Sequence, residues 1–468
     1  MRYCRTKIVC TLGPATATRD SLRGLVEAGM DVARVNFSHG THEQHAETIR
    51  LVREVATELK RPVAILGDLQ GPRIRIGDLA GPIQLDNGAD VVLSPEEKVT
   101  HANEIPVTYD RLAEDLHSGD RILIDDGLLE LIVTDVKKPR VMARVLHGGP
   151  LRSHKGMNFP GVLVSAPSLT DKDRSDVGFA SQQELDYLAL SFVRRAADIE
   201  ELRRLLPKGL LIIAKIEKDS ALANIEEIVP ASDGVMVARG DLGVELPFEQ
   251  VPLAQKRIIA LANQIGRPVI TATQMLESMI TNPRPTRAEA SDVANAIIDG
   301  TDAVMLSAET AAGKYPRLAV EAMSRIISEI EKSPPAQRRE ERRPRGSGVS
   351  TELAIAAASS AAVRMLVSPC LIVFTKSGFS ARIVASQRPN VEILVLTDVA
   401  RTYRQLALIW GVVPELVPHA NSYDEMVQMA LEAVRRRGLA RAGDKVVVTA
   451  GVPFDVPGST NTMKVETV

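Results

Sequence analysis

Two segments of the 468-residue chain place charged side chains where they could act on an anionic substrate. In the first segment, Lys215 and Glu217 lie two residues apart at the end of the apolar run 210–216. If this run is a β-strand, both side chains are on one face of it. In the second segment, Asp241 follows the apolar run 234–238 between two glycines, which permit a tight backbone path beside its carboxylate. Two carboxylates can bind a hard divalent cation, and a neighbouring lysine favours phosphoryl transfer.

Each of these charges, taken alone, is more simply interpreted as a solvated strand end. The chemical interpretation gains support because polar residues also follow the other predicted strands. If they surround one pocket, Arg34, Arg75 and Lys215 can hold a phosphate, while Glu217 and Asp241 hold Mg2+. The further polar residues at strand ends are Asn36, Ser38, His39, Asp68, Arg73, Ser191, Thr271, Thr273, Gln274, Ser307 and Glu309.

Eight short apolar runs that alternate with helical patterns must position these residues. The alternation predicts a (β/α)8 TIM barrel, in which the C-terminal ends of all strands lie on one face. After the fifth strand, the pattern predicts a single helix from Asp219 to Val229, capped by Asp219 or Ser220. The predicted strands span residues 7–11, 31–35, 62–66, 187–190, 210–216, 234–238, 268–271 and 303–306.

The alternation is interrupted after the third strand by short β-like runs between Gly, Asp and Pro turns, which predict an inserted domain. Beyond the barrel, glutamates among the arginines of residues 334–348 favour a solvated linker over a nucleic-acid-binding tract. The rest is predicted to be a small α/β domain with a parallel sheet. The predicted domains are a catalytic barrel (1–70 and 162–336), a β-rich insert (71–161), a linker (337–348) and a C-terminal α/β domain (349–468).

Composition argues against several classes of function. The chain is 45% apolar and 25% charged, and its net charge of −2 provides no general attraction for nucleic acid or an anionic membrane. Its three cysteines, Cys4, Cys10 and Cys370, fit a reducing compartment better than a disulfide framework. No apolar run reaches the ~20 residues of a membrane span, and the N-terminus lacks a signal core. We therefore expect a cytoplasmic protein.

Eight motifs together resemble the pyruvate kinase family over essentially the whole chain, although any one of them alone is a moderate signal. The resemblance implies a (β/α)8 barrel, an inserted β-barrel-like lid domain and a C-terminal three-layer α/β regulatory domain, usually in a homotetramer. It also implies transfer of the phosphoryl group of phosphoenolpyruvate to ADP in glycolysis, giving pyruvate and ATP. The motifs are TKIVCTLGPA (6–15), DVARVNFSHG (31–40), DLQGPRIRIG (68–77), IIAKIE (212–217), VMVARGDLGVE (235–245), VITATQMLESM (269–279), NPRPTRAEASDVANAIIDGTDAVMLSAETA (282–311) and GSTNT (458–462).

The resemblance also implies roles for individual residues. Glu217 and Asp241 would bind Mg2+, or Mn2+ in its place, while Lys215 would neutralise the phosphoryl group in transfer and the enolate left behind. Arg34 and Arg75 would hold the phosphoryl oxygens. The implied substrate contacts are Arg34, Lys215, Asp241, the backbone of Ala238, Arg239 and Gly240, and Thr273, which would order the water that protonates the enolate. The implied nucleotide contacts are Pro14, His39, Arg75 and Lys155, although His39 could instead cap the next helix and Lys155 could be solvated.

One motif departs from the members of the family that require K+. Those members usually carry Thr-Lys after the aspartate and Glu after Gly-Pro, whereas this chain has Leu69-Gln70 and Arg73. The positive charge of Arg73 is predicted to replace the ion, so that the enzyme works without K+. The remaining residues of the former K+ site, Asn36, Ser38, Asp68 and Leu69, are then doubtful metal ligands, and the polar ones would orient Arg73 and Arg34.

A strand-to-helix turn in the C-terminal domain carries donors that suit a phosphate group. In the family, this region binds phosphorylated allosteric effectors, and the alternative is an ordinary turn with a serine cap. The effector residues predicted here are Thr375, Lys376, Ser377, Ser380 and Arg382. Trp410, the single tryptophan, is predicted to lie in the core or an interface.

Two other functions remain as alternatives to a pyruvate kinase. A non-catalytic sensor of phosphorylated metabolites could keep the fold, but it would be expected to lose the lysine or the carboxylate pair, and all three residues are present. Another Mg2+-dependent barrel enzyme of enolate chemistry, an aldolase or lyase, could use the same carboxylates. It would have no need of the lid, or of Arg75 and Lys155.

Overall fold

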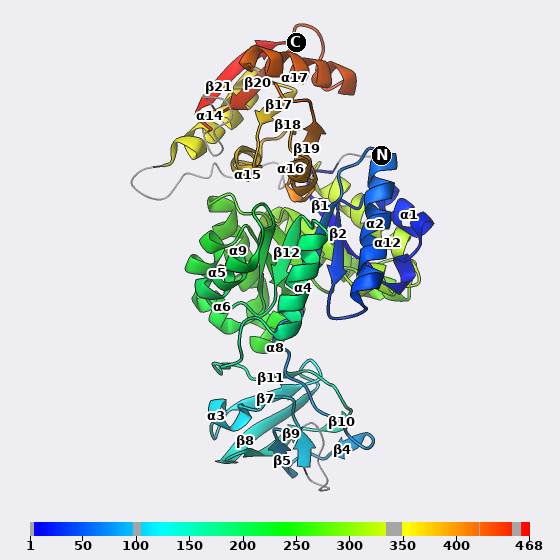
Figure 1. Ribbon diagram of the computed structural model, residues 1–468, viewed down its shortest axis with the longest axis vertical. Coiled ribbons are helices and arrows are strands. Elements are labelled where there is room, and N and C mark those ends of the chain that lie inside the picture. Colours follow the sequence, from blue (N-terminus) through cyan, green and yellow to red (C-terminus); the bar gives the residue numbers. More distant parts are fainter. Residues whose placement is uncertain (1–3, 97–103, 334–348, 421, 452–459) are drawn as a thin grey trace.

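The computed structural model describes residues 4–96, 104–333, 349–420, 422–451 and 460–468. Its longest axis passes through three bodies (Figure 1): a β-rich domain at one end, a barrel in the middle and an α/β domain at the other end. The predicted linker, 337–348, and the first two residues of the GSTNT motif lie outside the described residues. Among the described helices, none is both long and apolar enough to span a membrane.

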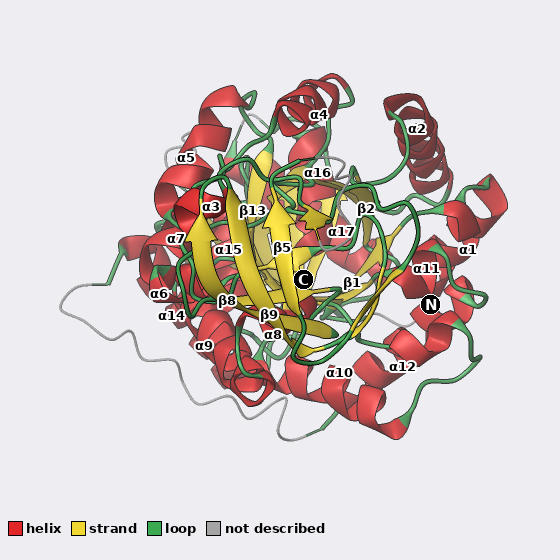
Figure 2. Ribbon diagram, turned by 90° about the horizontal axis from the view of Figure 1, so that it is seen from below, coloured by secondary structure: helices red, strands yellow, loops and turns green. Residues whose placement is uncertain are grey.

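The middle body is a closed barrel of eight parallel strands, which confirms the predicted fold class. Helices surround the strands in Figure 2. The strands are β1 (Lys7–Thr11), β2 (Val32–Asn36), β3 (Ala64–Asp68), β12 (Tyr187–Leu190), β13 (Leu211–Ile216), β14 (Gly234–Ala238), β15 (Val269–Ala272) and β16 (Ala303–Leu306). The longer helices are α1 (Arg19–Ala28), α2 (His42–Glu58), α4 (Asp171–Gln182), α5 (Ala196–Leu205), α9 (Val251–Gln264), α10 (Arg287–Asp299) and α12 (Pro316–Ile330).

Four of these helices begin at a threonine that forms a capping box. Thr18, Thr41, Thr170 and Thr286 each accept the backbone N–H of the third helical residue, whose side chain bonds back to the threonine N–H. The prediction of a single helix between β13 and β14 was wrong. The segment forms two helices, α6 (Asp219–Ala223) and α7 (Ile225–Ala231), and the backbone of Lys218 precedes α6 without a side-chain cap.

The inserted domain leaves the barrel after β3 and has a hydrophobic core of its own, which includes Leu93, Ile122 and Leu131. Its main sheet has the order β11-β7-β8-β9-β5-β6, and β10 pairs with β4 in a second, two-stranded sheet. The elements are β4 (Ile83–Leu85), β5 (Asp90–Ser94), β6 (Glu104–Pro106), α3 (Leu112–Asp115), β7 (Arg121–Ile124), β8 (Leu129–Lys137), β9 (Arg140–His147), β10 (Gly149–Leu151) and β11 (Met157–Asn158).

The C-terminal body is a five-stranded sheet in the order β19-β18-β17-β20-β21, with α14 and α17 among its helices. The predicted parallel sheet is present in β17, β18, β19 and β20, and β21 is added antiparallel to β20. Sequence reasoning missed β19, which contains Pro414, and β21, which is a polar edge strand. The elements are α14 (Thr351–Leu366), β17 (Cys370–Phe374), α15 (Phe379–Ser386), β18 (Glu392–Thr397), α16 (Ala400–Gln405), β19 (Val412–Leu416), α17 (Tyr423–Arg437), β20 (Lys445–Ala450) and β21 (Thr462–Thr467).

The C-terminal body closes the end of the barrel opposite the insert. Ala407 and Leu408, just beyond α16, join the buried cluster formed by inward-facing side chains of the barrel strands. The hydroxyl of Tyr187 donates to Gln405 O at 2.7 Å. Trp410 is 6% exposed, and the guanidinium of Arg388 lies 4.8 Å from the centroid of the Trp410 ring. The prediction that Trp410 lies in the core or an interface is confirmed.

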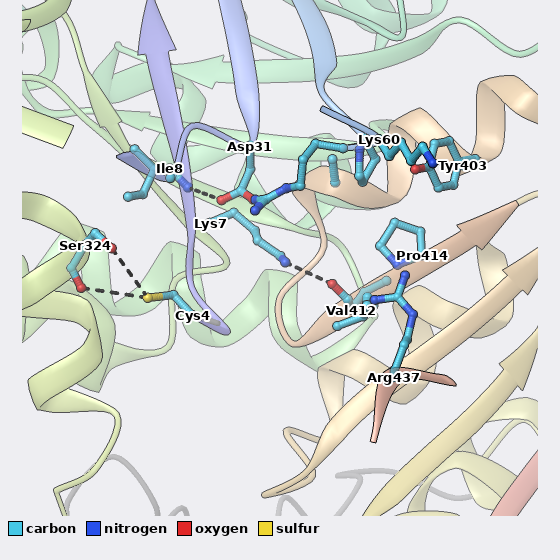
Figure 3. A pocket seen from close by; sticks show the side chains of 15 residues that line it. Cys4, Lys7, Ile8, Asp31, Lys60, Ser324, Tyr403, Val412, Pro414 and Arg437 are labelled. Atoms are coloured by element: carbon cyan, nitrogen blue, oxygen red, sulfur yellow. Dashed lines mark hydrogen bonds and ion pairs between the residues drawn. The ribbon is translucent and has the colours of Figure 1, made fainter. Parts of the chain in front are cut away.

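A cavity of about 220 Å³ remains at this junction between the two bodies (Figure 3). Lys7 crosses it from β1, and its Nζ donates to Val412 O in β19 at 2.9 Å. Burial lowers the pKa of Lys7, while the nearby carboxylate of Asp31 opposes this change. The junction is therefore tied by polar contacts as well as by apolar packing.

Candidate active site

The C-terminal ends of the barrel strands face the inserted domain, and a cavity of about 330 Å³ lies between the two. Barrel loops contribute Phe192, Lys218 and Asp241 to its lining, and the insert contributes Lys155 and Asn158. The chain enters the insert through Gly71, whose φ of +69° suits glycine. A Cβ there would come within 2.8 Å of Phe192 Cδ2, so this turn is also too crowded for a larger residue.

Lys215 lies near the C-terminal end of β13, and its side chain is 12% exposed. Its ammonium is 2.8 Å from Glu217 Oε1, 2.8 Å from Ser191 Oγ and 3.4 Å from Asp68 Oδ1. Burial acts to lower the pKa of Lys215, but the carboxylates of Asp68 and Glu217 outweigh it and raise the pKa above its ordinary value. Lys215 therefore stays charged in a site that is nearly closed to water.

Glu217 follows the last residue of β13 and is 1% exposed. Its Oε2 accepts the backbone N–H of Phe192 at 2.6 Å. Burial raises the pKa of Glu217, Lys215 opposes this increase, and the negative charge of Asp241 raises the pKa further. The two carboxylates are thus close enough to repel one another.

This repulsion is the feature that fits a divalent cation, because a bound cation would remove it. Within the described part of the chain, no three His, Cys, Asp or Glu side chains are grouped to hold a metal ion. Glu217 and Asp241 would then supply two oxygen ligands, and the other ligands would come from substrate and water. Such a ligand set is usual for Mg2+, which keeps waters and shares substrate phosphates.

Arg34 extends from β2 beside Lys215 and is held in one orientation. Its Nε donates to Asp68 Oδ2 at 2.7 Å, and its Nη2 lies 2.6 Å from the same oxygen. Its Nη1 donates to Thr11 Oγ1 at 2.9 Å. Burial acts to raise the pKa of Asp68, but Lys215 and Arg34 outweigh it and lower the pKa. Asp68 therefore remains ionised and fixes both basic groups.

The polar residues proposed to orient Arg73 make other contacts. Asn36 Oδ1 accepts the backbone N–H of Ser38 at 3.1 Å, and Asp68 pairs with Arg34 and Lys215. Arg73 instead approaches Asp241, with Nη2 3.9 Å from Oδ1. Of the two side chains that these residues were expected to orient, Arg34 is held by Asp68, whereas Arg73 points towards Asp241.

The loop after β15 carries Thr273, whose backbone has a φ of +71°, an uncommon value for a β-branched residue. Its Oγ1 accepts the N–H of Gly240 at 2.7 Å, which joins this loop to the start of α8 (Arg239–Glu245). The guanidinium of Arg239 donates to Thr273 O at 2.8 Å and pairs with Asp292 at 2.6 Å. The Arg239 side chain thus supports the loop.

Two of the four residues predicted for the nucleotide line the cavity, and two do not. Arg75 donates to His154 O at 2.9 Å, and Lys155 Nζ pairs with Asp125 Oδ1 at 2.8 Å. Pro14 and His39 are exposed to solvent, and neither is among the described residues that line this cavity. The alternative that His39 caps α2 was wrong, since Thr41 is the cap.

The predicted effector residues are split between two surroundings. Lys376 pairs with Asp398 and His419, and Ser380 Oγ accepts from Thr460 Oγ1 at 2.6 Å. Arg382 instead lies against the barrel in a small cavity, where burial lowers its pKa. The turn itself is closed by Thr375 Oγ1, which accepts the N–H of Gly378 at 3.0 Å, and Ser377 O accepts from Arg382 at 3.3 Å.

Sequence reasoning did not single out several residues of the cavity. Asp125, Asn158, Phe192 and Lys218 all line it. Lys218 directly follows Glu217 and Asn158 lies three residues after Lys155, so both are close to residues that were predicted. The direction in which their side chains point depends on how the insert packs against the barrel. No local sequence pattern specifies this packing.

A lysine, two arginines and a carboxylate pair at the mouth of a (β/α)8 barrel, beneath an inserted domain, define an enzyme for small phosphorylated anions. Family models described as "Pyruvate kinase, barrel domain" and "Pyruvate kinase, alpha/beta domain" match residues 3–320 and 353–466. The chain belongs to the pyruvate kinase family, and it is therefore a phosphotransferase of glycolysis.

Individual relatives match almost the whole chain. A pyruvate kinase of Geobacillus stearothermophilus is 48% identical, with 99% of this chain and 80% of the relative covered. Pyruvate kinase 2 of a Synechocystis species is 47% identical, with 99% and 79% covered. A pyruvate kinase of Staphylococcus aureus is 44% identical, with 99% and 80% covered.

Proposed function

We propose that the protein transfers the phosphoryl group of phosphoenolpyruvate to ADP in the cavity between barrel and insert. The observation that carries the proposal is the Lys215 ammonium, held charged between Asp68 and Glu217 beside a second carboxylate. A positive charge fixed in a site of low water content stabilises negative charge that develops during reaction. We assign Lys215 to the phosphoryl group in transfer and to the enolate left behind.

The other basic residues would bind the phosphoryl group. Arg34, already oriented by Asp68, and Arg75, on the entry to the insert, can donate to its oxygens. Glu217 and Asp241 would hold Mg2+, which supplies charge neutralisation at the carboxylate and phosphoryl oxygens when bound. Mn2+ is the alternative ion.

The substrate carboxylate would be received by the backbone of Ala238, Arg239 and Gly240. Thr273 would order the water that protonates the enolate, because its hydroxyl is too weak an acid to act alone. The contact between Thr273 Oγ1 and the N–H of Gly240 supports this assignment, because Gly240 belongs to the segment assigned to the substrate carboxylate.

The insert would act as a lid that carries part of the nucleotide site. Lys155 and Arg75 line the cavity and would contact the phosphates of ADP, while Pro14 and His39 would contact the rest of the nucleotide at the cavity's edge. Closure of the lid would exclude water, so that the phosphoryl group reaches ADP instead of being hydrolysed.

A coupled assay of ADP-dependent pyruvate formation tests this function. Activity with Mg2+, phosphoenolpyruvate and ADP is expected. A sensor would bind phosphoenolpyruvate without turnover, and an aldolase or lyase would act without ADP. Wild-type protein that is inactive with Mg2+ and both substrates would overturn the proposal.

We further propose that Arg73 supplies the charge that other family members obtain from K+. Its guanidinium faces Asp241 from across the cavity, and Asp68 is already neutralised by Arg34 and Lys215. Both observations leave little negative charge for a monovalent cation near Asn36, Ser38 and Leu69.

Regulation is proposed at the turn formed by Thr375, Lys376, Ser377 and Ser380. Its donors suit a phosphorylated effector, and Lys376 is held at the turn by Asp398. Arg382 would contribute indirectly, through its bond to Ser377 O. Titrating activity against sugar phosphates and AMP would identify the effector, and no response to any of them would argue against the site.

We also propose a homotetramer in the cytoplasm. Exposed apolar side chains occur on two different bodies: Phe248 and Leu253 on the barrel, and Met365 and Val367 on the C-terminal domain. Two separate apolar patches, each meeting its own copy on another subunit, are what a dimer of dimers needs. All three cysteines are free thiols, which supports a reducing compartment.

A further inference from the structure

We propose that Glu245 is a positioning residue that holds the lid on the barrel mouth through Asn158 and thereby sets the affinity for the nucleotide. Glu245 ends α8, and its side chain is 4% exposed. Its Oε1 accepts Asn158 Nδ2, from lid strand β11, at 3.1 Å and Lys218 Nζ, from the barrel, at 2.7 Å. One carboxylate oxygen therefore joins a strand of the lid to two segments of the barrel.

Helix stability does not explain a carboxylate at this position. The C-terminal end of a helix carries a partial negative charge, so a glutamate there is unfavourable. Burial adds a desolvation cost, which the ion pair with Lys218 must offset. The residue is therefore best explained by the contact that it makes with the lid, and not by the helix that carries it.

The partners of Glu245 are close in sequence to the residues of the proposed site. Asn158 is the last residue of β11 and lies three residues after Lys155. Lys218 directly follows Glu217 and lies 5.8 Å from the ring centroid of Phe192. The contact with Glu245 thus fixes where the lid segment of Lys155 lies relative to the carboxylate pair.

The inference rests on the proposed function, in which the lid contacts the nucleotide and the barrel contacts phosphoenolpyruvate. Loss of the Asn158–Glu245 contact should therefore weaken ADP more than phosphoenolpyruvate. A residue that merely supported the fold would weaken both substrates together or lower the amount of folded enzyme.

The test compares Asn158→Ala, Glu245→Ala and the double variant by steady-state kinetics and by calorimetric binding of ADP. Each single variant should raise the KM and Kd for ADP roughly tenfold, the effect of losing about 1.4 kcal/mol. The KM for phosphoenolpyruvate should stay near that of the wild type. The double variant should be no worse than Glu245→Ala alone, because both changes remove one contact.

Two matched variants serve as controls. Glu245→Gln retains an acceptor for Asn158 and should keep an ADP affinity close to the wild-type value. Asn87→Ala removes a lid asparagine that bonds to Gly148 within the lid, and it should leave both KM values unchanged. Amide exchange of residues 155–158 should increase in Asn158→Ala and not in Asn87→Ala.

The outcomes separate this inference from the proposed function. An active wild type with a normal KM for ADP in Asn158→Ala, or additive defects in the double variant, would overturn the positioning role alone. Wild-type protein without ADP-dependent turnover would overturn the proposed function and this inference with it.

Discussion

Lys215, Glu217, Asp68 and Arg34 form a compact set in which each charge faces a partner of opposite sign. Because the set is almost closed to water, removing one member leaves the others with uncompensated charge. Substitutions here should therefore affect chemistry strongly, and the stability of each variant must be measured beside its activity.

Lys215→Ala should lose most of the turnover, on the order of a thousandfold, because it removes the charge that stabilises the developing anion. The coupled pyruvate assay measures this loss, and circular dichroism shows whether the fold is kept. Turnover near the wild-type level would contradict the role of Lys215.

Arg73→Glu should convert the enzyme to one that depends on K+, because it removes a fixed positive charge and adds an oxygen ligand. Turnover is compared in sodium-free buffer with and without KCl. The wild type should respond little and the variant strongly. Strong activation of the wild type by K+ would show that Arg73 does not replace the ion.

The types of the site residues could be predicted from sequence because they follow strand ends, whose geometry is regular. The directions of the long side chains could not. Arg73 turned to Asp241, and Arg382 turned to the barrel, because each follows the charges and cavities that tertiary packing brings near it. Neither direction is encoded within a few residues of the chain.

At the scale of elements, the start of α10 is fixed by a single carboxylate. Glu289 accepts the backbone N–H and the hydroxyl of Ser278 at 2.7 and 2.6 Å, and the N–H of Thr286 at 2.7 Å. Burial acts to raise the pKa of Glu289, but these hydrogen bonds outweigh it and lower the pKa. The ionised form is therefore the one that the folded state favours.

Glu289→Gln should lower the stability of the barrel at neutral pH by about 1 kcal/mol, a typical value for a capping interaction. A lowered folded pKa gives stability that is present above the unfolded pKa and lost as pH falls through the folded one. The difference in apparent melting temperature should thus vanish in acid. A difference that persists at acidic pH would show that the charge is not responsible.

Several strands were predicted with the residues that the structure has, among them β1, β12, β14 and β16. Their apolar runs are buried on both faces and end at clear turn residues. β19 and β21 were missed because β19 contains a proline and β21 is polar, so neither sequence is typical of a strand. Both are strands because they pair with a neighbouring strand of the sheet. Local propensity was overridden there by tertiary context.

At the scale of the whole molecule, the exposed apolar side chains on the barrel define the proposed contact between copies. Leu253 is 69% exposed on α9 and Phe248 is 83% exposed just before it.

Leu253→Glu should split the tetramer into dimers, because two like charges would meet in a symmetric contact. Sedimentation or light scattering measures the mass, with Leu205→Glu as a control at another exposed leucine. A wild type that is monomeric, or a variant that stays tetrameric, would contradict this interface.

The floor of the barrel has a consequence for how the protein is made. Ala407 and Leu408 complete the interior of a body whose own strands end at Leu306, about a hundred residues earlier. During synthesis from the N-terminus, one end of the barrel therefore stays exposed, with apolar side chains in contact with water, until the C-terminal domain has left the ribosome. A nascent chain arrested before residue 400 should bind chaperones that recognise apolar surface, and release them once β19 has emerged.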